Sequence, residues 1–194
     1  MGRRFRKSSH AKNEHSNGKH RFEHWYRDNT VYFITAKVRD GFHAFESEEA
    51  KAIFWERFTH WTAHFGFTPW VTTLLDNHYH TVGYLKIGAN LGTMMQRIHG
   101  SVAKLVNDVL PERHLPFWRD RASKVKDYYD GCLRSELQGR RAYRYTLLQS
   151  VYAKLVIDWR DYPHTHVTID LERGVKRALY LHAFMTDVRY PRYE

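Results

Sequence analysis

The chain has 194 residues, which fits one domain of ordinary size or one domain with extensions. Hydrophobic residues make up 42% of it and aromatic residues 15%, enough for a packed core, so a wholly disordered chain is excluded. The formal net charge of +10 favours a polyanionic partner, first a nucleic acid and second an anionic membrane surface.

Membrane insertion and secretion are not expected. No apolar run approaches the roughly 20 residues that cross a bilayer, and the polar, basic N-terminus lacks the apolar centre of a secretory signal. The single Cys132 excludes an intrachain disulfide and a cysteine-based zinc site. We therefore expect a reducing, cytoplasmic setting.

The first 20 residues are polar and basic. They combine Arg and Lys with Ser, Asn and Gly, a composition typical of a flexible segment. We expect an arm over residues 1–24, which is either a solubilising tail or an arm that binds nucleic acid.

A regular pattern begins at residue 31. The stretch "VYFITAKV" (31–38) is β-branched and aromatic and predicts a strand. The next segment, 47–66, predicts a helix with Ser47 as its N-cap and Gly66 as its stop. Its apolar residues recur at helical spacing, at Phe54, Phe58, Trp61 and Phe65.

Two further strands and a second helix follow. Residues 67–75 and 78–85 predict strands that meet at a tight turn of Asp76 and Asn77. Residues 90–108 predict a helix that starts at an Asn90 cap. Its apolar face is formed by Leu91, Met95, Ile98, Val102 and Leu105.

The remaining elements complete an α+β fold. Residues 117–129 predict a strand, and residues 135–156 and 171–185 predict helices. The order from 31 to 129 is β-α-β-β-α-β, the ferredoxin-like or RRM-like split βαβ arrangement. We expect a four-stranded antiparallel sheet with both of its helices on one face. The opposite face is left for a ligand or for the later helices.

The stretch "LLDNHYHTVGYL" (74–85) holds a pair of histidines, His78 and His80. A chain with fourteen His is expected to contain about one such spacing by chance, and a second, "HTH", occurs at His164 and His166. In a strand, residues i and i+2 point to one face, so His78 and His80 can share a divalent ion while Tyr79 points the other way. The second pair follows "DYP", which predicts a loop. The first pair is therefore the better candidate.

The same stretch resembles the HUH motif of single-tyrosine HUH transposases, the insertion-sequence enzymes that move as single strands together with the REP-associated tyrosine transposases. That motif commonly reads Pro-Asn-His-hydrophobic-His. Here Asn77 and both histidines match, Tyr79 takes the hydrophobic position, and Asp76 replaces the usual proline.

A second block, "YTLLQSVYAKLVIDWRDYPHTH" (145–166), resembles the tyrosine helix of the same family. Gln149-Ser150 is closer to the Tyr-x-x-x-Gln of the insertion-sequence branch than to the Asn-Pro of the REP-associated branch. Between the blocks, "FWRDRASKV" resembles the family's Trp-basic strand. The matching positions of the second block are Tyr145, Gln149, Val151, Ala153, Leu155, Val156, Asp161 and Tyr162.

The resemblance spans about residues 25–166 and implies a catalytic domain there, with 167–194 as a C-terminal helical extension. It implies a transposase or endonuclease that nicks and rejoins single-stranded DNA, hairpin-forming DNA in particular, with Tyr145 as the nucleophile. It also implies Mg²⁺ or Mn²⁺ bound by His78, His80 and Gln149. Short members of the family are homodimers in which the partner's tyrosine helix completes each site.

Helix geometry agrees with these roles. Residues i and i+4 lie on one face, so Tyr145 presents its phenol beside the neutral oxygen ligand of Gln149. Two imidazoles and one amide leave the charge of a divalent ion available to a phosphate oxygen. Tyr143 and Tyr152 are rival nucleophiles on the same predicted helix.

Basic residues cluster near these motifs and predict a groove for DNA phosphates. A solvated charged face is the alternative for each of them. The candidates are Arg119, Arg121, Lys124 and Lys126 on the predicted strand, and Arg140, Arg141 and Arg144 before the tyrosine.

Two other functions fit parts of the sequence. A non-catalytic module that binds single-stranded nucleic acid through a ferredoxin-like sheet leaves the Tyr145 and Gln149 match unexplained. A metal-dependent phosphoesterase that activates water requires more carboxylates near the histidines.

Overall fold

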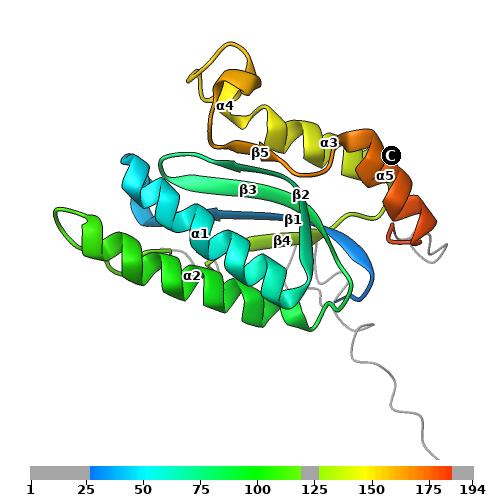
Figure 1. The fold of residues 1–194 in the computed structure, drawn as a ribbon, viewed down its shortest axis with the longest axis horizontal. Helices are drawn as coiled ribbons and strands as arrows, with labels where there is room; N and C mark the ends of the chain where they lie inside the picture. Colours follow the sequence, from blue (N-terminus) through cyan, green and yellow to red (C-terminus); the bar gives the residue numbers. More distant parts are fainter. Residues whose placement is uncertain (1–26, 119–126, 185–194) are drawn as a thin grey trace, which may run out of the picture.

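A five-stranded antiparallel sheet forms the centre of the molecule, with the strand order β4-β1-β3-β2-β5 (Figure 1). The structure is a computed structural model that describes residues 27–118 and 127–184. The strands are β1 (Thr30–Lys37), β2 (Phe67–Leu74), β3 (His78–Leu85), β4 (Tyr129–Cys132) and β5 (Thr165–Val167). The helices are α1 (Glu48–Phe65), α2 (Asn90–Val109), α3 (Glu136–Leu147), α4 (Gln149–Tyr152) and α5 (Leu171–Tyr180), with short 3₁₀ turns η2 (Arg39–Gly41) and η3 (Trp159–Asp161).

The first four strands follow the predicted split βαβ order. Helix α1 begins as expected, because the Ser47 side chain accepts a hydrogen bond from the Ala50 N–H, and it ends at Gly66 with a left-handed φ of 72°. The β2–β3 hairpin closes with a Leu75 N–H to His78 carbonyl bond of 2.8 Å. These local signals were sufficient to define the first half of the fold.

Several predicted boundaries were wrong, among them the end of the last helix, which lies at Tyr180 rather than at residue 185. Asn90 is the first residue of α2 rather than its cap, and its side-chain amide instead donates to the Phe65 carbonyl at 3.2 Å. Of the strand expected over 117–129, the described residues 117, 118, 127 and 128 lie outside any strand, and β4 begins at Tyr129. The helix expected over 135–156 is interrupted at Leu148, whose φ of −95° and ψ of 9° separate α3 from α4.

The fifth strand was not predicted. Strand β5 pairs antiparallel with β2, opposite Val71–Thr73, and it contains His166. The segment after "DYP" is therefore a short edge strand rather than a loop. Three residues are too few to show an alternating pattern.

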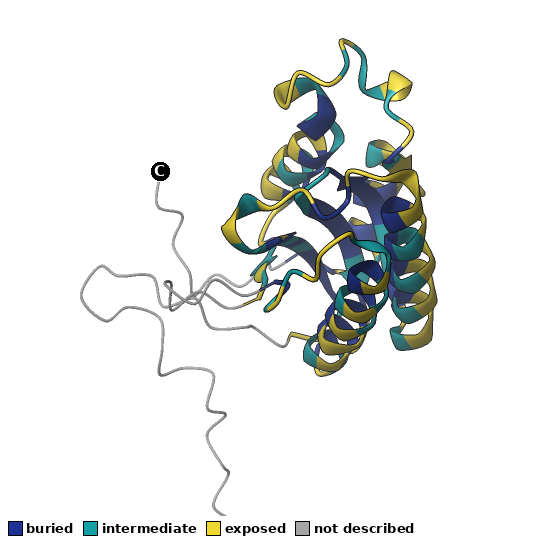
Figure 2. Cartoon of the chain, turned by 90° about the vertical axis from the view of Figure 1, so that its left-hand side faces the viewer, coloured by how far each residue is buried: buried dark blue, intermediate teal, exposed yellow. Residues whose placement is uncertain are grey.

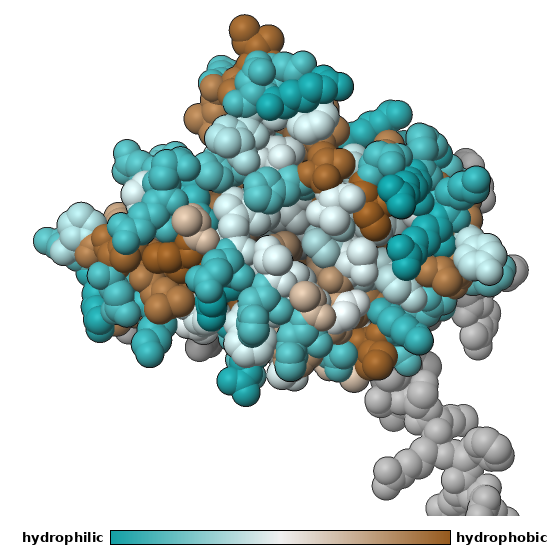
Figure 3. Space-filling model, in the orientation of Figure 1, coloured by the Kyte–Doolittle hydropathy of each residue, from teal (hydrophilic) through white to brown (hydrophobic). Residues whose placement is uncertain are grey.

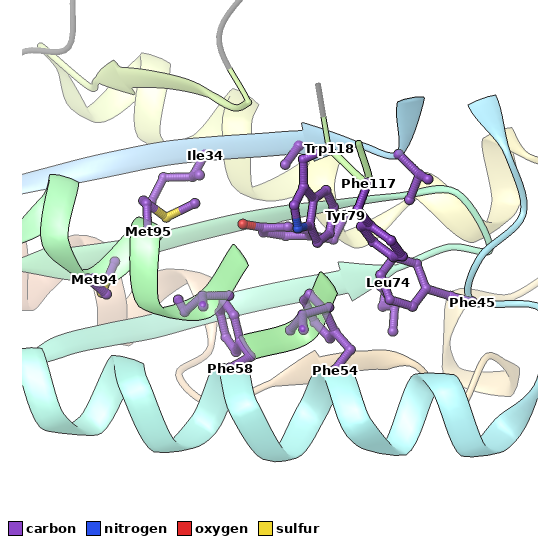
Figure 4. Packing of buried hydrophobic residues seen from close by; sticks show 14 of the residues in the cluster. Ile34, Phe45, Phe54, Phe58, Leu74, Tyr79, Met94, Met95, Phe117 and Trp118 are labelled. Carbon is purple, nitrogen blue, oxygen red and sulfur yellow. The ribbon is translucent and has the colours of Figure 1, made fainter. Parts of the chain in front are cut away.

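One hydrophobic core lies between the sheet and α1 and α2. Its centre is aromatic, with Phe54 and Phe58 of α1 packed against the fully buried Tyr79 of β3 (Figure 4). Trp118 packs here too, and its indole N–H donates to the His99 carbonyl at 3.0 Å. This core holds the central strands of the sheet from one side.

A second core lies on the opposite face, under α3 and α5 (Figure 1). The sheet is therefore covered on both sides, and buried strands lie between helices whose outer sides are exposed (Figure 2). Residues of the C-terminal extension contribute directly to this core, since Val175 and Ala178 of α5 are buried in it. The later helices thus occupy the face that the split βαβ unit leaves open.

Beyond α4 the chain carries apolar side chains into solvent. Leu155 is 49% exposed and Ile157 is 97% exposed, and apolar surface is visible at the top of the molecule, over the α4 segment (Figure 3). Among the described residues, no helix combines the length and the apolar character needed to cross a membrane.

Substitution of Gly174 by Ala tests the close packing of α5. A Cβ at Gly174 would lie 2.8 Å from Trp70 Cδ2, so the helix must shift, and we expect the free energy of unfolding to fall by about 1–3 kcal/mol. Gly100→Ala is the matched control, because Gly100 lies inside α2 with nothing within 4 Å, and it should raise that free energy by up to about 1 kcal/mol. Urea unfolding of both variants measures the difference, and equal effects would contradict the packing.

Candidate active site

Strand β3 presents His78 and His80 on the face of the sheet that α3 and α5 cover. Their imidazole centroids are 5.0 Å apart, at 85° to one another. Tyr79 points to the opposite face, where its hydroxyl hydrogen-bonds with His99 Nε2 at 3.0 Å. The alternation of the strand therefore places the two histidines side by side, as the sequence pattern predicts.

Both imidazoles are neutral around pH 7. Burial lowers the pKa of His80 to about 3, with the nearby His78 as a smaller cause, and burial also lowers the pKa of His78. His80 Nδ1 is buried, and among the described residues no hydrogen-bond partner faces it. The site thus holds an imidazole nitrogen without a hydrogen-bond partner in the described part of the chain.

Gln149 brings an amide to the two histidines. It is the first residue of α4 and is 6% exposed. Its Nε2 donates to the Tyr145 carbonyl at 3.1 Å. The polar side chain of Gln149 also raises the pKa of both imidazoles, against the larger effect of burial. The expected relation between residues 145 and 149 therefore persists across the interruption at Leu148.

Tyr145 lies directly on this group. Its ring centroid is 5.3 Å from that of His80, in an edge-to-face arrangement, and its side chain is 46% exposed. Tyr143 is instead buried in the second core, where its hydroxyl donates to the Ile169 carbonyl at 3.0 Å. Tyr152 is 58% exposed and its ring lies 6.3 Å from that of Tyr145. Tyr145 thus combines contact with His80 and access to solvent, and it does so within one chain.

Two residues that the motifs did not include hold this arrangement together. The Thr73 hydroxyl donates to the Thr146 carbonyl at 2.7 Å and so fixes α3 on β2, in register with His80. Phe33 of β1 stacks on His80 at 5.8 Å and meets the Tyr145 ring edge at 6.0 Å. Their signal in the sequence is indirect, because it requires the register of β1, β2 and β3.

The residues present fit a divalent metal ion. Two neutral imidazoles from β3 and a neutral amide from α4 gather at one place, and they offer an N,N,O donor set to a divalent ion. Among the described residues no three His, Cys, Asp or Glu side chains group as metal ligands, and Gln149 is the further donor beside the two histidines.

The second histidine pair, His164 and His166, does not offer free ring nitrogens in the same way. His164 Nδ1 accepts from the Trp55 indole N–H at 3.2 Å, and His164 Nε2 lies 3.0 Å from a Glu48 carboxylate oxygen. His166 stacks on Trp55 at 3.6 Å. Both ring nitrogens of His164 are thus occupied, and this pair joins β5 to α1.

Of the predicted DNA-binding residues, some are exposed, one forms ion pairs, and the others lie outside the described residues. Arg141 and Arg144 are exposed on α3. Arg140 is engaged with Glu136 at 2.7 Å and with Glu172 at 2.8 Å, so it joins α3 to α5. The remaining candidates, Arg119, Arg121, Lys124 and Lys126, lie outside the described residues.

The chain was compared with protein families, curated proteins and solved structures. No protein-family model matches the chain, and the curated proteins contain no match. Among solved structures, the chain is similar to that of a REP-associated tyrosine transposase bound to a REP hairpin, with a TM-score of 0.62 and 15% sequence identity. The match covers 90% of this chain and 96% of that one. The two proteins therefore share a fold over nearly their whole length.

The burial of His80 predicts a pH effect on stability. The folded protein protonates His80 only near pH 3, whereas the unfolded chain does so near the ordinary pKa of 6.5. Between these values the unfolded state binds more protons, so the free energy of unfolding falls as the pH falls, by up to about 1.4 kcal/mol per pH unit. His80→Gln, which does not titrate, should show a correspondingly shallower slope in urea unfolding between pH 6.5 and 4 with a chelator present. Parallel slopes for the two proteins would contradict a buried neutral His80.

Proposed function

We propose that the protein nicks and rejoins single-stranded DNA through a covalent 5′-phosphotyrosine at Tyr145. The observation that carries this proposal is the position of a half-exposed phenol on His80, beside His78 and Gln149. A nucleophile next to groups that can hold a divalent ion suits phosphoryl transfer. The shared fold with a tyrosine transposase supports it.

The chemistry is a transesterification. Tyr145 Oη attacks the scissile phosphorus, the bond from phosphorus to the 3′ oxygen breaks, and the phosphate stays on the tyrosine. The phenol releases one proton and the leaving 3′ oxygen takes one up, so no net proton is consumed. Because the ester energy is retained in the phosphotyrosine, a 3′-hydroxyl can reverse the reaction and rejoin the strand without ATP.

The protein groups have separate tasks in this reaction. Phe33 and the bond from Thr73 to the Thr146 carbonyl orient the tyrosine. His78, His80 and the Gln149 amide oxygen would hold Mg²⁺ or Mn²⁺. When bound, such an ion would polarise the phosphate and stabilise the leaving oxygen.

The substrate we propose is single-stranded DNA that forms a hairpin. Arg141 and Arg144 are exposed on the same helix as Tyr145, and the chain carries a net charge of +10, so phosphates are attracted to this side of the site. The transposase of similar fold is bound to a REP hairpin. A binding module without chemistry would not need a phenol in contact with His80.

Tyr145→Phe should abolish covalent adduct formation. Phe retains the ring that packs on His80 and Phe33 but lacks the nucleophilic oxygen. The measurement incubates labelled hairpin oligonucleotides with Mn²⁺ and each protein, followed by a denaturing gel. Tyr152→Phe is the matched control and should form the adduct as the wild type does. An adduct that persists in Tyr145→Phe would refute Tyr145 as the nucleophile, and no adduct from the wild type across a broad hairpin panel would favour the binding module.

Mn²⁺ affinity should depend on Gln149. We expect Gln149→Ala to weaken Mn²⁺ binding by at least about tenfold, because the amide oxygen is lost beside the two imidazoles. Gln149→Glu should bind Mn²⁺ more tightly than the wild type, since it adds a negative charge at the same place. Calorimetric titration without DNA measures both. His166→Ala, in the other histidine pair, should bind like the wild type, and an equal loss there would indicate that the ion binds elsewhere.

A further inference from the structure

Beside the site, the helices of the described chain leave part of the sheet uncovered. Helix α3 packs on β2 and β3, and the bond from Thr73 to Thr146 fixes it on β2. The neighbouring strands β1 and β4 carry exposed or half-exposed residues. On the face that carries the histidines, these are Lys37, Thr35 and Phe33 of β1 and Tyr129 of β4, which we call the β1–β4 strip. It borders Tyr145, because Phe33 contacts both the Tyr145 and the Tyr129 rings.

Tyr129 supplies an aromatic surface in this strip. It lies opposite Thr35 in the β1–β4 register and is 42% exposed. A Cβ at Gly131 would lie 3.0 Å from Tyr129 Oη and 3.5 Å from its Cζ, so the ring reaches across Gly131 and fills the space of a missing side chain. The glycine thus lets the ring lie along the strand, 6.3 Å from Phe33.

Lys37 supplies a positive charge at the other end. It is exposed and lies opposite His78 in the β1–β3 register. Its Nζ is 3.5 Å from the point that a Gly41 Cβ would occupy, and Asn77 Nδ2 is 3.9 Å from the same point, so the ammonium lies toward the Asn77–His78 edge of the site. The charge of Lys37 also contributes to the lowered pKa of His78. Within the described part of the chain, Lys37 forms no ion pair.

The two groups lie at opposite ends of the strip. Lys37 and Tyr129 are diagonal neighbours across β1 and β4, since Tyr129 pairs with Thr35 two residues away. The Tyr129 ring extends over Gly131 and the Lys37 ammonium extends toward Asn77, so a strand that crosses β1 beside the histidines can meet both groups. Asp130, the acidic neighbour of Tyr129, alternates to the opposite face of the sheet.

We propose that the β1–β4 strip binds an unpaired nucleotide next to the scissile phosphate, with the base on the Tyr129 ring and a neighbouring backbone phosphate on Lys37. This inference rests on the proposed function, since it places the nucleotide beside Tyr145. Stacking is tolerant of base identity because every base presents a π face. The strip therefore holds the strand in position for attack without selecting its sequence.

Fluorescence of 2-aminopurine tests the stacking. The base analogue is placed in turn at each unpaired position flanking a hairpin and is bound to a Tyr145→Phe protein, which leaves the DNA uncut. We expect quenching at one position. The added Tyr129→Leu change should abolish this quenching and weaken binding by about tenfold, whereas Tyr129→Phe should retain both. Tyr180→Leu is the control, because Tyr180 is 82% exposed on α5, away from the strip.

A neutral phosphate tests Lys37. Lys37→Gln should weaken binding of the unmodified DNA strand several-fold. On a strand with an uncharged methylphosphonate at the phosphate that Lys37 contacts, the wild type and Lys37→Gln should bind equally. Lys86→Gln, at another exposed lysine, should lose affinity equally for both strands. If the wild type forms the adduct but Tyr129→Leu and Lys37→Gln leave quenching and binding unchanged, the proposed nucleotide binding by the strip is wrong and the proposed function is not affected. A wild type that forms no adduct would count against the proposed function. The quenching measurement would still decide whether the strip binds a nucleotide, because quenching needs no cleavage.

Discussion

The hydrogen bond from the Thr73 hydroxyl to the Thr146 carbonyl is the contact on which the site depends. It joins β2 to α3 at the residue after Tyr145, and Thr73 is the direct neighbour of His80 in the sheet. Both groups are buried, so the bond is not exchanged with water, and losing one partner leaves the other unsatisfied at a cost of about 1–3 kcal/mol. The position of the phenol relative to the imidazoles is therefore set by a rigid junction of helix and sheet.

The second core makes that junction possible. Tyr143, two residues before Tyr145, is buried there, and the neighbouring Arg140 holds Glu172 of α5. One face of α3 is thus committed to packing, and the helical period carries Tyr145 to the edge of that face, between His80 and solvent. The same packing dehydrates His80 and keeps it neutral, a state in which its nitrogen can serve as a ligand.

Local signals were enough to predict the split βαβ order and the residues that gather at the site. The caps of α1, the β2–β3 turn and the His78/His80 alternation are all properties of short segments. The rest depends on tertiary contacts. Leu148 is a good helix former, so its sequence gives no sign of the interruption between α3 and α4. Strand β5 is too short for a pattern, and the roles of Phe33, Thr73 and Lys37 follow only from strand register.

Asp76, which stands where the HUH motif usually has a proline, illustrates how a different contact can supply the same constraint. A proline would restrict the turn before His78 through its own φ angle. Here the Asp76 carboxylate lies 3.2 Å from the ammonium of Lys51, a buried residue of α1, and the Asp76 carbonyl accepts from the Phe45 N–H at 2.8 Å. The Asn77 carbonyl accepts from the Val38 N–H at 2.8 Å. The turn is thus held from α1 and from the end of β1, so the orientation of His78 depends on the first core as well as on the second.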